Sequence, residues 1–138
     1  MTEDQRETQP DEGSIYLAGP FFDLGQRWVV EEVYRALADL GARVFSPLHE
    51  VGTGQSPDAI AEADLEGLRG CSKVLALLDG ADPGTIFEVG YARALGIPVV
   101  ALAERLEREN LTMIAGAGCE VTQDLASAIY HVIWTKGR

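Results

Sequence analysis

The carboxylates of Asp82 and Glu88 lie in the segment 77–92 (LLDGADPGTIFEVGYA), which leads from an apolar strand through a tight turn into a helix. Proline and glycine favour the turn, and Thr85 is the expected N-cap of the helix. Glu88 then falls in the first helical turn, where unpaired backbone N–H groups and the helix dipole favour negative charge. We therefore expect Glu88 to be ionised at neutral pH, and an ionised carboxylate at the mouth of a crevice can act as a nucleophile.

The spacing of Thr85 and Glu88 is also that of a capping box, in which the glutamate bonds back to the backbone N–H of the cap residue. A capping box accounts for neither Asp82 upstream of the cap nor Gly84 beside it. Open α/β sheets bind ligands outside the carboxyl ends of their strands, where this turn is expected to lie. These surroundings favour a catalytic Glu88 over a purely structural one.

A second candidate site follows the first predicted strand, in the segment 15–22 (IYLAGPFF). Gly19 allows the backbone to approach a ligand closely, and Phe21 and Phe22 could stack on a planar ligand such as a nucleobase. Each ring could equally plug the edge of the core. The segment has neither the GxGxxG of dinucleotide sites nor the Gly-Lys-Ser/Thr of a P-loop, so neither kind of site is predicted.

The elements that position these residues are apolar β-type runs that alternate with segments of helical period. Repeated β-α units with short connections predict one α/β domain with a doubly wound, parallel, five-stranded sheet. The fold would bring both candidate segments toward the same strand ends. Strands are predicted at 14–18, 43–46, 74–78, 97–103 and 111–114, helices at 26–40, 58–68, 85–95 and 122–134, and a loop at 47–57.

Composition limits the kind of protein. The 138 residues, of which 46% are hydrophobic, suit one domain, predicted at 14–138, after a disordered acidic tail at 1–13. With 22 acidic and 11 basic residues, the formal net charge is −11. This charge argues against nucleic-acid polymers and anionic membranes as partners.

No basic and apolar leader opens the sequence, and no apolar stretch approaches the ~20 residues that span a membrane. We therefore expect a cytoplasmic protein with reduced thiols at Cys71 and Cys119. A thiol nucleophile assisted by His49 or His131 could be drawn, but no local signature supports it.

Asp64, Asp79 and Asp82 offer oxygen ligands of the kind that suit magnesium. Nothing in their spacing fixes a coordination geometry. No metal ion and no cofactor are therefore predicted.

Three segments, 16–20 (YLAGP), 63–65 (ADL) and 82–92 (DPGTIFEVGYA), follow one another along the chain. Together they resemble motifs of the nucleoside 2-deoxyribosyltransferase family, and the resemblance covers roughly residues 14–103. It implies a flavodoxin-like (Rossmann-like) fold. It also implies cleavage of the N-glycosidic bond of a nucleoside through a covalent glycosyl-glutamate, with transfer of the deoxyribosyl group to another nucleobase.

By this resemblance, Glu88 matches the nucleophilic glutamate and Tyr16 the tyrosine that orients it. Asp82 and Asp64 match acidic residues that hold the nucleobase and help protonate it as it leaves. These residue types suit the reaction, because a fixed anion stabilises an oxocarbenium-like transition state and a proton donor lets the base depart. If water attacks instead of a base, the same site is a hydrolase of nucleosides or nucleoside 5′-monophosphates, and a non-catalytic nucleotide sensor is a third alternative.

The family's sites are completed across subunits, so the resemblance implies a homo-oligomer that takes small-molecule nucleosides, nucleotides and nucleobases. Asn110 is the candidate for an asparagine that contacts the sugar in a neighbouring subunit, although it directly precedes a predicted strand. Arg27 and Ser56 are candidates for a 5′-phosphate, and Arg27 could equally be a solvated residue at a helix start. The remaining predicted substrate-binding residues are Gly19, Pro20, Phe21, Phe22, Asp64, Gly84 and Thr85.

Overall fold

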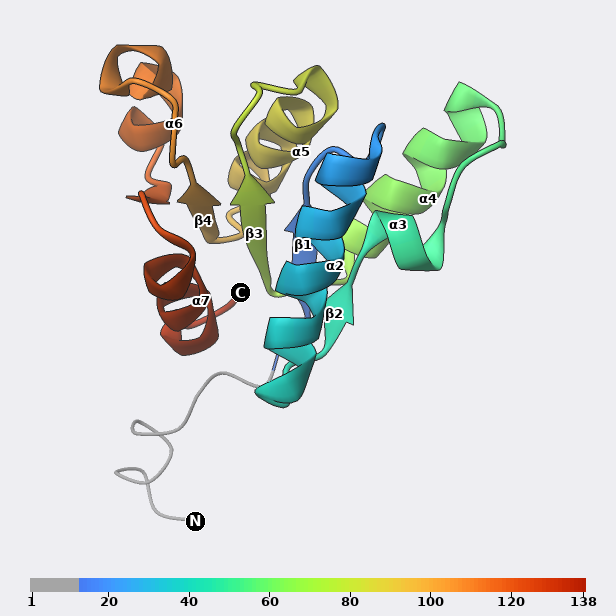
Figure 1. Cartoon of the computed structure of the whole chain (residues 1–138), viewed down its shortest axis with the longest axis horizontal. Coiled ribbons are helices and arrows are strands. Elements are labelled where there is room, and N and C mark those ends of the chain that lie inside the picture. The colour runs from blue at the N-terminus through green and yellow to red at the C-terminus, as the bar shows by residue number, and fades with distance from the viewer. Residues whose placement is uncertain (1–12) are drawn as a thin grey trace.

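The structure is a computed structural model that describes residues 13–138. The predicted acidic tail, apart from Gly13, lies outside the described residues. The chain forms one parallel sheet in the order β2-β1-β3-β4-β5, which confirms the predicted doubly wound α/β fold (Figure 1). Its strands are β1 (Ile15–Ala18), β2 (Val44–Phe45), β3 (Lys73–Leu77), β4 (Val99–Leu102) and β5 (Glu120–Thr122).

Helices connect the strands, and the four longest begin at an Asp or Ser whose side chain accepts a backbone N–H. Among the described residues, no helix is long and apolar enough to cross a bilayer. The helices are α2 (Leu24–Asp39), α3 (Pro47–Glu50), α4 (Pro57–Arg69), α5 (Pro83–Ala94), α6 (Thr112–Gly116) and α7 (Leu125–Trp134), with a 3₁₀ turn, η1, at Arg108–Leu111.

The predicted fifth strand at 111–114 is wrong, because this segment belongs to η1 and α6. A short apolar run fits either a strand or a helical turn, so its pattern does not decide. The true fifth strand contains the exposed Glu120 and only three residues, and no apolar run marks it. The last helix begins at Leu125 rather than at residue 122, because Asp124 caps it.

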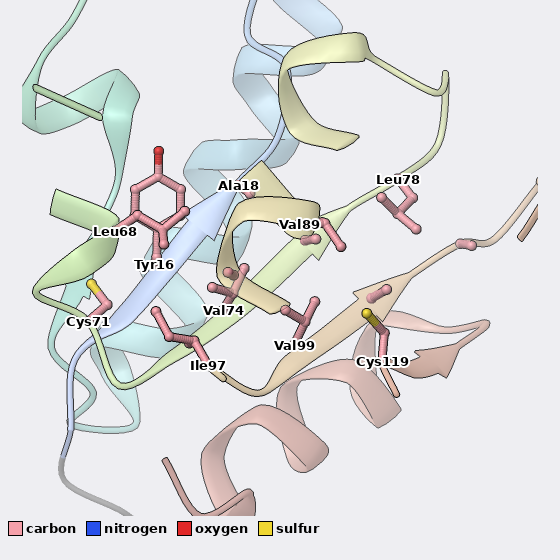
Figure 2. Close-up of a cluster of buried hydrophobic side chains, with 14 of the residues drawn as sticks. Tyr16, Ala18, Leu68, Cys71, Val74, Leu78, Val89, Ile97, Val99 and Cys119 are labelled. Atoms are coloured by element: carbon pink, nitrogen blue, oxygen red, sulfur yellow. The ribbon is translucent and has the colours of Figure 1, made fainter. Parts of the chain in front are cut away.

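Side chains of each strand alternate between the two faces of the sheet and form two apolar clusters. Helices α2 and α7 cover one face, and α4, α5 and α6 cover the other (Figure 1). The cluster under α4 and α5 contains Tyr16, Val74 and Val99, together with Val89 of α5 (Figure 2). This second face carries the candidate site at its carboxyl edge.

Candidate active site

Tyr16 is the second residue of β1 and is fully buried, with 0% of its surface exposed. Its hydroxyl donates a hydrogen bond to Oε2 of Glu88 on α5. Its ring stacks on Phe45 of β2, with a centroid separation of 5.6 Å and an interplanar angle of 10°. Figure 2 shows Tyr16 among the buried side chains of the cluster. A phenol held by a strand and by a second ring therefore fixes one oxygen of Glu88.

The turn before α5 differs from the prediction in its cap. Asp82, not Thr85, is the N-cap: its Oδ2 accepts hydrogen bonds from the backbone N and the Oγ1 of Thr85, both at 2.9 Å. Pro83 suits the first helical position, since its fixed φ is helical and it has no N–H to satisfy. Glu88 consequently lies in the second turn, not the first, and its carboxylate bonds to Tyr16. The capping-box interpretation is therefore wrong.

Burial changes the ionisation of Glu88. The pKa of Glu88 is raised from 4.5 to about 7: burial raises it most, the hydrogen bond from Tyr16 lowers it, and the charges of Asp64 and Asp82 raise it. This direction argues against the expectation of a fully ionised Glu88 at neutral pH, because burial disfavours the charged carboxylate. Burial also raises the pKa of Tyr16 well above its usual range, so the phenol remains a donor. A carboxyl with a pKa near the working pH is a typical feature of catalytic sites.

Asp64 on α4 has an oxygen with no partner among the described residues. Its Oδ1 is buried and makes no hydrogen bond. Burial raises the pKa of Asp64, which favours the protonated carboxyl. A buried polar oxygen without a partner is costly, and a neutral carboxyl can donate a hydrogen bond. Asp64 is thus suited to bind a polar atom of a ligand.

These carboxylates open into a pocket of about 460 Å³ at the carboxyl edge of the sheet. The pocket lies between the turn after β1, the start of α4 and the start of α5. Of the predicted site residues, it is lined by Gly19, Pro20, Phe21, Phe22, Asp64, Asp82, Gly84 and Glu88.

Apolar residues that the sequence analysis missed complete the wall of this pocket. Phe87 precedes Glu88 and is 62% exposed, which is unusual for an aromatic side chain. Ile60 lies one helical turn before Asp64 on α4, so helical spacing from Asp64 could have indicated it. The residues missed in this way include Ile60, Ala61, Leu65, Pro47, Pro57 and Phe87.

The other predicted residues do not line this pocket. Thr85 is buried, and both its backbone N and its Oγ1 donate hydrogen bonds to Asp82. The exposed Arg27 donates from Nε to the carbonyl oxygen of Phe21 at 3.1 Å. Asn110 is exposed in η1.

Two further polar residues serve the fold. Ser56 caps α4 by accepting a hydrogen bond from Ala59 N at 3.3 Å. The carboxylate of Asp79 accepts hydrogen bonds from the backbone N–H groups of Glu104 and Arg105, at 3.0 and 2.8 Å. Asp79 therefore joins the loops after β3 and β4 and does not line the pocket with Asp64 and Asp82.

A sequence model of the nucleoside 2-deoxyribosyltransferase family matches residues 15–124, a span that contains Tyr16, Asp64, Asp82 and Glu88. The chain belongs to this family. The match confirms the resemblance carried by the three motifs. No curated protein matches the chain in sequence.

Two solved 2-deoxyribosyltransferases are similar to this chain in structure. The 2-deoxyribosyltransferase of the psychrotolerant bacterium Bacillus psychrosaccharolyticus is 27% identical over 91% of this chain and 98% of its own, with a TM-score of 0.69. The enzyme of Leishmania mexicana is 23% identical over 86% of this chain and 96% of its own, with a TM-score of 0.64.

A CMP N-glycosidase of Clostridium botulinum shares the fold as well. It is 23% identical over 79% of this chain and 85% of its own, with a TM-score of 0.60. The nucleoside 2-deoxyribosyltransferase family is enzymatic and acts on small-molecule nucleosides or nucleotides and nucleobases. The pocket beside Glu88 is the candidate place for that chemistry.

Proposed function

We propose that this protein transfers the deoxyribosyl group of a nucleoside to a second nucleobase, with Glu88 as the nucleophile. The observation that carries the proposal is the hydrogen bond from Tyr16 to Glu88 at the floor of an apolar pocket. Asp64 adds a buried oxygen without a partner to the same pocket. A carboxylate, an orienting phenol and a proton donor are the groups that N-glycosidic cleavage needs.

In the first half-reaction, ionised Glu88 attacks the anomeric carbon of the sugar through its free Oε1. The carbon–nitrogen bond breaks, its electron pair passes to the base, and the carboxyl of Asp64 donates a proton to the departing base. The Tyr16 hydroxyl holds Oε2 so that Oε1 faces the sugar. Asp82 lies close enough to raise the pKa of Glu88, and it lines the base side of the pocket.

In the second half-reaction, another nucleobase attacks the anomeric carbon from the side that the first base has left. The ester bond to Glu88 breaks and returns its electron pair to the carboxylate. Asp64, now ionised, accepts the proton of the incoming base. Two displacements retain the configuration of the anomeric carbon.

Hydrolysis is the alternative outcome, in which water attacks the glycosyl-glutamate. The apolar wall formed by Phe21, Phe22 and Phe87 supports transfer, because it favours a planar base over water in the vacated space. The enzyme of Bacillus psychrosaccharolyticus is a biocatalyst for nucleoside synthesis, which is also transfer. No lysine or arginine is among the described residues that line the pocket, which disfavours a substrate with a 5′-phosphate dianion.

We also propose that the working form is a homo-oligomer with its sites near subunit interfaces. Phe22, which lines the pocket, is 80% exposed, and Leu24 and Trp28, one helical turn apart on α2, are 86% and 66% exposed. Contiguous exposed apolar surface of this kind marks interaction sites. In such an assembly Asn110 of a neighbouring copy would be free to contact the sugar.

The deciding experiment incubates the protein with deoxynucleosides, ribonucleosides and their 5′-monophosphates, with and without an acceptor base, and separates products by chromatography. We expect base exchange with deoxynucleosides, and loss of all base release in Glu88→Ala. Glu62→Ala, which changes an exposed glutamate of α4 outside the pocket, is the matched control and should remain active. Free sugar would indicate a hydrolase, and binding without base release would indicate a sensor.

A further inference from the structure

Gly67, in the last turn of α4, leaves room for an aromatic ring of β2. A β-carbon at Gly67 would lie 2.3 Å from Cζ of Phe45 and 2.4 and 2.6 Å from its two Cε atoms. Non-bonded carbons pack at about 3.5–4.0 Å, so no side chain fits here while the ring keeps its place. Glycine weakens a helix interior relative to alanine. The ring of Phe45 gives a physical reason for glycine at this position.

The same ring supports the tyrosine of the candidate site. Phe45 stacks nearly parallel on Tyr16, and Tyr16 donates its hydroxyl hydrogen to Glu88. The contacts therefore run from Gly67 on α4, through Phe45 and Tyr16, to Glu88 in the pocket. Neither Phe45 nor Gly67 lines that pocket.

We propose that Phe45 and Gly67 are positioning residues of this enzyme: Gly67 seats the ring of Phe45, and that ring holds the Tyr16 hydroxyl on Glu88. The inference rests on the proposed role of Glu88 as the nucleophile. It assigns a catalytic consequence to two residues that touch neither the sugar nor the base.

The surroundings of Phe45 determine how a side chain at position 67 would act. An open groove of about 540 Å³ runs between β2 and α4 and is lined by both Phe45 and Gly67. A methyl group at position 67 displaces the ring, and this disturbs its stacking on Tyr16. The phenol then gains freedom, and its hydrogen bond to Glu88 weakens. Because that hydrogen bond lowers the pKa of Glu88, its weakening raises the pKa.

The experiment compares Gly67→Ala, Phe45→Leu and the double variant with the wild type. Gly90→Ala is the matched control, because Gly90 also lies inside a helix and a β-carbon there meets nothing within 4 Å. Each protein is assayed for kcat and KM across pH. The ionisation of Glu88 is followed without substrate, by NMR of ¹³C-labelled glutamate carboxyls.

In Gly67→Ala we expect kcat to fall roughly ten- to a hundred-fold with KM nearly unchanged, as for a small misplacement of a catalytic group. The acid limb of the kcat profile and the Glu88 titration both move to higher pH. Phe45→Leu moves them in the same direction, because Tyr16 loses its stacking partner. The double variant is no worse than Phe45→Leu alone, because no ring remains for the methyl group to displace.

A folded Gly67→Ala with an unchanged profile and an unchanged Glu88 titration would overturn the inference. The inference would also be overturned if the fold-loss of kcat in the double variant equalled the product of the two single losses, because Gly67 and Phe45 would then act independently. If Gly67→Ala does not fold, Phe45→Leu decides by the same readings. If the wild type releases no base, or Glu88→Ala is fully active, the proposed function fails, while the Glu88 titration still tests the positioning by Phe45 and Gly67.

Discussion

The two faces of the sheet are built from the same strands but have different side chains. Beneath α2 and α7 the strands present large aliphatic residues: Ile15, Leu17, Leu75, Leu77, Val100 and Leu102. Beneath α4 and α5 they present small residues toward their carboxyl ends: Ala18, Ala76, Ala101 and Ala103. Small side chains at this edge allow the start of α5 to lie close to the sheet.

Charge is handled differently on the two faces as well. The buried Lys73 of β3 donates from Nζ to the carbonyl oxygens of Ile133 and Thr135, both at 3.0 Å, and so supports the end of α7. On the other face, Asp64 keeps an oxygen without a partner, and burial raises the pKa of Glu88 to about 7. One face satisfies its buried charge for stability, and the other keeps polar capacity for a ligand.

Of the variants considered, Glu88→Gln on the α4/α5 face should have the largest effect on activity. We expect base release to fall at least roughly a thousand-fold, because an amide cannot form the glycosyl ester. Initial rates by chromatography measure the loss, and thermal unfolding checks that the fold is intact. If the folded variant kept wild-type rates, the face under α5 would have only a packing role.

Leu75→Ala tests the opposite face. Leu75 of β3 is fully buried beneath α2 and α7. We therefore expect its truncation to lower the free energy of unfolding by about 2–5 kcal/mol. Urea titration measures it. The pH dependence of kcat for the folded variant should match that of the wild type. A shifted pH dependence would show that packing on the α2/α7 face affects the candidate site on the other face.

Tyr16→Phe sharpens the account of the α4/α5 face. Removal of the hydroxyl removes the hydrogen bond that lowers the pKa of Glu88, so the acid limb of the rate profile should move to higher pH. We expect kcat to fall roughly ten- to a hundred-fold, because Glu88 loses its orienting partner. An acid limb that stays in place would mean that Tyr16 does not set the ionisation of Glu88.

The dependence of stability on pH gives a smaller effect. The folded-state pKa of Glu88 is raised from 4.5 to about 7, so between these values the folded protein binds more protons than the unfolded chain. Stability relative to Glu88→Gln should therefore fall as pH rises through this window, by on the order of 1–3 kcal/mol. Denaturant titrations of both proteins measure the difference. A difference in the free energy of unfolding that stays constant across this pH window would contradict a buried Glu88 with a raised pKa.

Sequence patterns predicted the central strands and the helix after the acidic turn well, because apolar runs and strong turn signals mark them. The predicted strand at 74–78 corresponds to β3, and the predicted helix at 85–95 to α5. The short β5 escaped prediction, since an exposed edge strand of three residues has no apolar run.

The ionisation of the candidate site could not be predicted from local sequence. The helix-start signals at Asp82 and Thr85 compete as caps, and only the backbone geometry decides between them. The pKa of Glu88 depends on burial against β1, a contact between residues far apart in the chain. The packing of Phe45 against Gly67 likewise joins residues that are far apart in the sequence.

The most direct test of the central claim is detection of the covalent intermediate. The protein is mixed with a deoxynucleoside in the absence of an acceptor base, quenched rapidly in acid, digested and mapped by mass spectrometry. We predict a deoxyribosyl group on the peptide that contains Glu88, with fragmentation placing it on that carboxyl, and none in Glu88→Gln. Release of base with no adduct on Glu88 at any quench time, or an adduct on another residue, would contradict the account.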